Sequence, residues 1–294
     1  MAENNFSLQK TLTMLLDEKK YHSLRDILST MNPADIAAIF DDLDQACLPL
    51  LFRLLPKELA AETFVEMEPE AQELLIRGFS DSELKEVIDE LYVDDAVDIV
   101  EEMPANVVQR ILSQAEPDMR KQINEILRYP EDSAGSIMTT EYVSLRPNMT
   151  VEEAILRIRR TGIDKETIYT CYVTRGHKLI GLTSVKDLLL CEDDDATIES
   201  IMQEHVITVS TLDDKEQVAQ MFSKYNFLAL PVVDTEDRLV GIVTFDDAMD
   251  VMEDEATEDM EKMAAMLPSE HPYMRSTPIE IWKNRIPWLL LLMV

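Results

Sequence analysis

The sequence predicts an α-helical domain, then a duplicated α/β domain, then a long acidic helix. Three observations predict this α plus α/β fold class: regularly spaced helix starts in the first third, an α/β pattern that occurs twice in the middle, and a run of acids with helical spacing after it. The chain has 294 residues, 46% of them hydrophobic, and only six glycines. This is enough for about two domains with apolar cores.

The helical domain is expected over residues 1–130. Its segments open at Pro33, Pro56, Pro69, Asp81, Asp94, Pro104 and Pro117. Proline fits the first turn of a helix and aspartate is a common N-cap. Apolar residues then recur at spacings of three and four, as at Leu84, Val87, Ile88 and Leu91. One short helix cannot bury such a stripe alone, so we expect the helices to stack as a right- or left-handed superhelix.

Residues 131–200 and 201–250 predict two copies of one α/β unit. The motif Ser-Ile-Met at 136–138 recurs at 200–202. Each copy continues with a β-branched run (at 206–209 in the second copy), an amphipathic helix, two strands and a further helix. The strands are expected at 168–173 and 178–183, and at 229–233 and 239–243. This β-α-β-β-α order leaves sheet faces uncovered, so we expect the copies to pack against each other.

An acidic helix should follow, with residues 251–275 as a connecting helix and linker. Nine acids and one base lie between Asp246 and Lys262. Asp247, Asp250 and Asp254 share one face with Glu258, beside an apolar stripe of methionines. Repulsion between such close carboxylates opposes the helix unless cations neutralise it. The alternative is an ordinary solvated acidic face.

Residues 276–294 predict the start of a truncated transmembrane helix. The last nine residues, 286–294, carry no charge, whereas a membrane span needs roughly 20 apolar residues. Lys283 and Arg285 precede the run, as the positive-inside rule expects on a cytoplasmic flank, and Trp282 and Trp288 fit a membrane interface. The alternative is a C-terminal core helix of a soluble scaffold.

The duplicated unit resembles a pair of CBS domains. The resemblance rests on residues 181–187 (GLTSVKD) and 241–247 (GIVTFDD), where a glycine, apolar residues and Ser or Thr precede an aspartate. With PEDSAGSIMT at 130–139 and EDEATEDM at 253–260, the whole chain resembles the cytoplasmic part of MgtE-type magnesium transporters. The resemblance implies a homodimer formed through the CBS domains, on the cytoplasmic side of the cell membrane. It further implies that Mg²⁺ bridges the acidic faces of the domains and holds a pore closed.

The resemblance also implies a set of magnesium ligands. They are Glu62, Asp94 and Asp98 in the helical domain, Asp214, Glu216, Ser223 and Asn226 in the second CBS unit, and Asp247, Asp250, Glu255, Glu258 and Asp259 on the connecting helix. Magnesium prefers oxygen ligands and keeps several waters, so these sites should be weak. Helix capping is the alternative for Asp94, and helix-dipole stabilisation for Asp214 and Glu216. The neutral amide of Asn226 would weaken any site that it joins.

An adenosine nucleotide is a second ligand that the resemblance suggests. Ser184, Asp187 and Thr244 match positions that hold ribose and phosphate in many CBS pairs, and Tyr169 or Phe227 could stack on a base. The alternative is that the hydroxyls only cap the next helix. No glycine-rich phosphate loop accompanies them, so ATP hydrolysis is not expected. A nucleotide-sensing module whose acids serve solubility is therefore the alternative function.

Composition argues against several other functions. With 58 acids against 27 basic residues, the net charge of -31 would repel nucleic acids. The three cysteines form no CxxC pair, which argues against a disulfide framework and a structural zinc site. The four histidines show no metal-ligand spacing and stand in no nucleophile motif. We therefore expect a protein that is not an enzyme.

Overall fold

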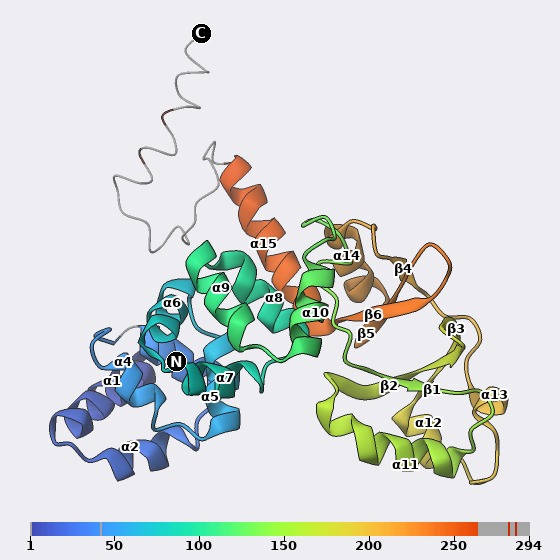
Figure 1. Ribbon diagram of the computed structural model, residues 1–294, viewed down its shortest axis with the longest axis horizontal. Helices are drawn as coiled ribbons and strands as arrows, with labels where there is room; N and C mark the ends of the chain where they lie inside the picture. Colours follow the sequence, from blue (N-terminus) through green and yellow to red (C-terminus); the bar gives the residue numbers. More distant parts are fainter. Residues whose placement is uncertain (1, 42, 264–281, 283–285, 287–294) are drawn as a thin grey trace. The chain divides into compact units, whose positions relative to one another are not determined.

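The chain divides into two compact units, residues 1–128 and 129–294. The structure, a computed structural model, describes residues 2–41 and 43–263 and the single positions 282 and 286 (Figure 1). The expected linker after residue 263 and the expected start of a membrane helix at 276–294 therefore lie outside the described residues, apart from those two positions. Among the described helices, none combines the length and the apolar character that a membrane span requires.

The first unit is a stack of short helices. They are α1 (Ala2–Asp17), α2 (Tyr21–Leu28), α3 (Pro33–Asp41), α4 (Leu48–Phe52), α5 (Lys57–Val65), α6 (Pro69–Gly78), α7 (Asp81–Ile88), α8 (Val93–Glu102), α9 (Ala105–Gln114) and α10 (Pro117–Ile126). Prolines begin α3, α6 and α10, and Pro56 and Pro104 are the N-caps of α5 and α9. The predicted helix starts are thus confirmed, with one change. Tyr92 is the N-cap of α8, so the capping role considered for Asp94 is wrong.

Each of several helices packs on the helix two places along the chain. Such pairs are α3 with α5, α5 with α7, α7 with α9 and α8 with α10. The predicted stripe of Leu84, Val87, Ile88 and Leu91 is buried. Helices two places apart therefore bury one another's apolar faces, as expected of a helical repeat.

The second unit contains the predicted β-α-β-β-α order twice. The first copy has β1 (Tyr142–Leu145), α11 (Val151–Thr161), a 3-10 turn η1 (Gly162–Asp164), β2 (Thr167–Arg175), β3 (Lys178–Ser184) and α12 (Val185–Leu190). After α13 (Ile198–Ile201), the second has β4 (Val209–Ser210), α14 (Lys215–Tyr225), β5 (Ala229–Val233), β6 (Leu239–Thr244) and α15 (Phe245–Met263). In both sheets the first strand is parallel to the second, and the second is antiparallel to the third. Of the β-branched run at 206–209, only Val209 lies in a strand, the two-residue β4, which pairs with Val232 and Val233 of β5.

The two copies pack against each other through their sheets, as expected. Tyr172 of β2 is fully buried in a cluster with Ala229, Leu239 and Ile242 of the second copy. Tyr142 packs edge-on against Tyr172 and donates a hydrogen bond from its hydroxyl to the Leu239 carbonyl, 3.3 Å away. Burial raises the pKa of the Tyr172 hydroxyl. The face between the sheets is therefore a shared core.

The residues at and just after each Ser-Ile-Met motif contact the other copy. Thr139, just after the first motif, exchanges backbone hydrogen bonds with Ile242 of β6. Gln203, just after the second, does the same with Leu182 of β3. A Cβ atom at Gly241 would lie 2.7 Å from the Met138 sulfur, and a Cβ at Gly181 would lie 2.7 Å from the Met202 sulfur. The motif glycines are therefore needed for close packing of each methionine.

Candidate functional site

The candidate acidic site lies on α14 and α15, which pack side by side (Figure 1). Asp214 is the N-cap of α14, and its Oδ1 accepts a hydrogen bond from the backbone N–H of Gln217 at 3.1 Å. Glu216 lies in the first turn, and its Oε1 accepts a hydrogen bond from the Gln220 side-chain amide at 3.0 Å. Both carboxylates sit at the positive end of the helix dipole, which stabilises them without a metal.

The start of α14 and the middle of α15 bring acids into electrostatic contact. Desolvation raises the pKa of Glu255, and the nearby charges of Glu216 and Glu258 raise it further. Desolvation also raises the pKa of Asp254, an effect that Lys215 opposes. Glu255 is therefore exposed to the negative charges of two other predicted magnesium ligands, Glu216 and Glu258. A cation would relieve this repulsion.

Asp247 is the most perturbed carboxylate of the predicted set. It is half-buried at the start of α15, and its Oδ2 accepts hydrogen bonds from the hydroxyl of Thr244 and from the Thr244 backbone N–H, the latter at 3.2 Å. Its pKa is raised to about 6, mainly by desolvation and also by the charges of Asp246 and Asp250, while the Thr244 hydrogen bonds lower it. Its charged form is therefore held at a free-energy cost.

The other predicted ligands of this unit are more exposed or already engaged. Asp250, Ser223 and Asp259 are exposed. Glu258 pairs with Lys262 at 2.6 Å. Asn226 ends α14 in the left-handed conformation, with φ of 55°. Asparagine tolerates this backbone geometry, which gives a structural reason for the amide at this position.

The predicted ligands of the helical unit are treated separately. Glu62 on α5 and Asp98 on α8 are exposed, whereas Asp94 is only 6% exposed and accepts a hydrogen bond from the Asp95 backbone N–H at 3.1 Å. Within the residues that the structure describes, no three or more His, Cys, Asp or Glu side chains are grouped closely enough to hold a metal ion. A magnesium site here would need ligands drawn together from separate places.

The nucleotide candidates all lie where strands meet helices. Ser184 and Asp187 form a capping box at the start of α12: the serine hydroxyl donates to Asp187 Oδ2 at 2.7 Å and accepts from the Asp187 N–H at 3.0 Å. Thr244 makes the related contact with Asp247. The capping alternative is therefore confirmed as a structural role for these hydroxyls, which does not decide whether they also bind a ligand.

The two candidate stacking residues, Tyr169 and Phe227, differ in how much of the ring is exposed to solvent. Tyr169 is 67% exposed and precedes Thr170, which pairs with Ser184. The Phe227 ring is partly buried against Phe222 and Tyr225. In the second copy, the register places Leu228, 60% exposed, at the position equivalent to Tyr169. Sequence reasoning missed Leu228, although its place one residue before β5 could have identified it.

Two protein families match consecutive parts of this chain. The MgtE intracellular N domain family matches residues 31–132, and the CBS domain family matches residues 134–192 and 198–254. The magnesium transporter MgtE of Thermus thermophilus is 38% identical over 292 residues, which are 98% of this chain and 64% of that protein. MgtE of Bacillus subtilis is 31% identical over 283 residues, 96% of this chain and 62% of that protein. The chain thus spans less than two thirds of the length of these relatives.

Two solved structures match most of the chain. A cytosolic domain of the Mg²⁺ channel MgtE in complex with ATP has 38% identity and a TM-score of 0.78, and the match covers 83% of this chain and 99% of that one. The soluble part of a magnesium transporter has 33% identity and a TM-score of 0.77, with 87% and 100% of the two chains covered.

Proposed function

Because this chain belongs to the MgtE family, whose N domain and tandem CBS domains it contains, we propose that it is the magnesium-sensing and gating region of a magnesium transporter. The observation that carries the proposal is the 38% identity to a magnesium transporter over 98% of this chain. In this proposal residues 1–130 are the helical domain, and 131–200 and 201–250 the CBS domains. Residues 251–275 connect them to a membrane domain that begins at 276–294.

The carboxylates of α14 and α15 fit a hard divalent cation. Desolvation and like charge raise the pKa values of Asp247, Asp254 and Glu255, so a cation beside them would stabilise their charged forms. Magnesium binds through one or two carboxylates and keeps several waters, so each site is weak and can respond to cytosolic concentrations. Bridging these acids to Glu62, Asp94 and Asp98 would hold the domains together.

Several weak sites can together act as a sharp switch. Moving a two-state equilibrium from 1:99 to 99:1 needs roughly a 10⁴-fold preference for one state. Four sites that each bind magnesium about tenfold more tightly in the closed state would supply it, since their preferences multiply. When magnesium is scarce, repulsion among the acids separates the domains and releases the connecting helix, so that the pore opens.

The test is the double substitution Asp247→Ala with Glu258→Ala in the full-length transporter. Transport should lose its inhibition by cytosolic magnesium. The matched control removes two acids of the first CBS unit, Asp164→Ala with Glu192→Ala, which are exposed and belong to no proposed site. Unchanged magnesium sensitivity in the first pair, or equal loss in the control pair, would contradict the proposal.

We also propose that the CBS units bind an adenosine nucleotide, since a relative with 38% identity is described in complex with ATP. The exposed ring of Tyr169, beside the pairing of Thr170 with Ser184, supports it. Stacking on a base is worth roughly 1–3 kcal/mol, so Tyr169→Ala should weaken ATP binding about tenfold in calorimetry. Tyr21→Ala, a partly exposed tyrosine of α2, is the control. Equal ATP affinity in both variants would remove Tyr169 from the site.

Association as a homodimer through the CBS units completes the proposal. Leu189 and Leu190 of α12 are 64% and 69% exposed, and Phe245 and Met249 of α15 are 46% and 45% exposed. Exposed apolar side chains on these two helices favour burial in an interface. Leu189→Glu should shift the mass in solution from dimer to monomer by light scattering, and an unchanged mass would place the interface elsewhere.

A further inference from the structure

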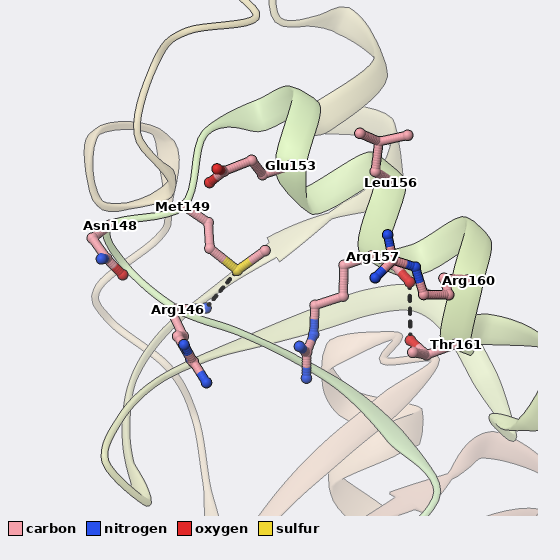
Figure 2. A pocket seen from close by; sticks show the side chains of 8 residues that line it. All are labelled: Arg146, Asn148, Met149, Glu153, Leu156, Arg157, Arg160 and Thr161. Carbon is pink, nitrogen blue, oxygen red and sulfur yellow. Dashed lines mark hydrogen bonds between the residues drawn. The ribbon is translucent and has the colours of Figure 1, made fainter.

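The first CBS copy carries an arginine pocket in an otherwise strongly acidic chain. It consists of two adjoining cavities of about 440 and 770 Å³, and both are lined by Arg146, Asn148 and Arg157 (Figure 2). Arg160 lines the smaller cavity, and Arg175 and His177 line the larger one. Four guanidinium groups therefore gather around one concave region of a protein with a net charge of -31.

Contacts within the first copy fix the position of Arg157. Its Nε donates a hydrogen bond of 2.8 Å to the Ser144 carbonyl, which ties α11 to the end of β1. The Ser144 hydroxyl in turn shares a hydrogen bond of 3.0 Å with the Thr174 hydroxyl on β2. Arg146 follows Ser144 by two residues, and Figure 2 shows its guanidinium pointing in the same direction as that of Arg157. The backbone of β1 thus fixes the Arg157 guanidinium, and that of Arg146 points in the same direction.

Of the two acids in the described lining, only Glu199 forms a salt bridge with one of these arginines. Glu153 uses Oε2 to accept the Thr150 backbone N–H at 3.1 Å, and Glu199 pairs with Arg175 at 2.6 Å. Across the ranges that the structure describes, Arg146, Arg157 and Arg160 take part in no salt bridge. Like charges held close together repel one another, and an anion between them would convert this repulsion into attraction.

The second copy demonstrates that the fold does not require the arginines. Thr150 and Asp214 are the N-caps of the equivalent helices α11 and α14, so the two copies align at this point. By the same alignment, serine at 210 stands where the first copy has Arg146, and methionine at 221 stands where it has Arg157. The second copy therefore lacks the cations of Arg146 and Arg157 and keeps one, Lys224, at the position of Arg160.

The pocket is separate from the candidate nucleotide residues. Arg175 and His177 lie at the turn between β2 and β3, whereas Ser184 ends β3. Six residues of strand separate Lys178 from Ser184, a distance of about 20 Å at 3.3 Å per residue. A ligand in the arginine pocket would therefore not share these candidate nucleotide contacts.

We propose that the arginine pocket binds a small anion that carries phosphoryl groups. Guanidinium groups match the geometry of phosphoryl oxygens with two parallel hydrogen bonds, and several of them suit a polyvalent anion better than a single carboxylate. The cavities have the size of small-molecule sites. Their concave shape favours a small ligand over a flat acidic protein surface.

Calorimetry with pyrophosphate as the probe tests this proposal on the 294-residue chain. The buffer contains no magnesium and is kept at constant ionic strength, because pyrophosphate binds magnesium and screening alone weakens ionic contacts. Arg146→Ser and Arg157→Met introduce the residues of the second copy. Each should weaken binding about tenfold, as expected for a lost charge-assisted contact. The control is Arg159→Ser, an exposed α11 arginine that lines neither cavity, and it should change affinity less than about twofold.

Three results would overturn the proposal. They are the absence of saturable binding at millimolar pyrophosphate, equal weakening in Arg159→Ser, and loss of binding in Ser184→Ala instead. Arg157→Met also removes the bond to Ser144, so it could disturb the fold. Arg146→Ser removes no side-chain hydrogen bond within the described structure. If Arg157→Met disturbs the fold, the pyrophosphate affinity of Arg146→Ser therefore tests the proposal. Because magnesium is absent, failure here leaves the magnesium-sensing proposal standing.

Discussion

The two CBS copies share a scaffold and differ in the charge that they display. Gly181 and Gly241 occupy matching places, each closed over by a methionine sulfur of the other copy's motif. Arginines of α11 and the neighbouring loop line a pocket in the first copy, whereas carboxylates whose pKa values are raised by desolvation lie on α15 in the second. The packing between the copies is therefore the same on both sides, while the charged side chains on their surfaces differ. The two proposals accordingly place a cation on the second copy and a phosphoryl anion on the first.

The largest expected effect comes from breaking the shared packing. In Gly241→Ala, the added Cβ would lie 2.7 Å from the Met138 sulfur and 2.8 Å from the Thr139 carbonyl oxygen. The carbonyl belongs to a backbone bridge with Ile242 and cannot move away freely. Overpacking of this kind costs about 1–3 kcal/mol, and we expect the upper half of that range. Calorimetric unfolding of the α/β unit would measure it.

The equivalent Gly181→Ala should destabilise to a similar extent, because its Cβ would meet Met202 and the Gln203 carbonyl at 2.7 and 2.9 Å. Gly78→Ala is the control, since nothing lies within 4 Å of its added Cβ at the end of α6. A large difference between the losses of unfolding free energy in Gly181→Ala and Gly241→Ala would mean that only one copy depends on the close contact.

The second copy should also contribute a pH dependence of folding stability that the first copy lacks, and this expected effect is smaller. The pKa of Asp247 is raised to about 6 by desolvation, whereas an unfolded aspartate titrates near 4. The folded state therefore binds an extra proton between pH 4 and 6, and stability falls as pH rises through this window. Asp247→Asn removes the charge while keeping an acceptor for Thr244. It should raise stability at pH 7 by about 1–2 kcal/mol and flatten the pH dependence, measured by urea unfolding.

The first copy supplies the control for this pH effect. Asp187→Asn changes the equivalent aspartate, which caps α12 through Ser184. It should leave the fall in stability between pH 4 and 6 in place. If both variants reduce the pH dependence of stability equally, the fall in stability does not arise from Asp247.

Much of the architecture could be predicted because it depends on local signals. Prolines at 33, 69 and 117 begin helices, and both strand pairs lie within two residues of the predicted ranges. Proline geometry and period-two patterns act over a few residues, so the sequence alone carries them. The Ser-Ile-Met repeat was visible too, but its role was not, because Met138 and Gly241 meet across about 100 residues of chain.

The candidate sites were predictable to different degrees. The acids of α15 stand close together in the sequence, so their mutual repulsion could be expected from helical spacing. The arginine pocket could not, because Arg146, Arg157 and Arg175 come from a loop, a helix and a hairpin that only the folded copy brings together. Tyr92 rather than Asp94 caps α8, since residue types favoured at N-caps do not by themselves fix where a helix begins.

A third test compares the helix caps of the two copies. Thr150 forms a full capping box with Glu153 at the start of α11. Thr150→Ala should cost about 1 kcal/mol of unfolding free energy, and Thr150→Ser should restore most of it. Thermal unfolding followed by circular dichroism would measure both. Equal losses in the alanine and serine variants would mean that the threonine methyl group, and not its hydroxyl, stabilises this end of the helix.

The smallest expected change in stability is that of Asp214→Ser. Substitutions at Asp214 can distinguish a role as a helix cap from a role as a metal ligand. Asp214 caps α14 through the Gln217 N–H, next to Glu216. Serine caps about as well as aspartate, so Asp214→Ser should change stability by less than about 0.5 kcal/mol, whereas Asp214→Ala should lose about 1 kcal/mol. The serine variant lacks the carboxylate, so its magnesium-dependent compaction, followed by small-angle scattering at matched potassium, should need about twice as much magnesium or more. If the serine variant compacts at the wild-type concentration while the alanine variant does not, Asp214 acts through the helix alone, and the acidic surface of the second copy must bind its cations further along α15.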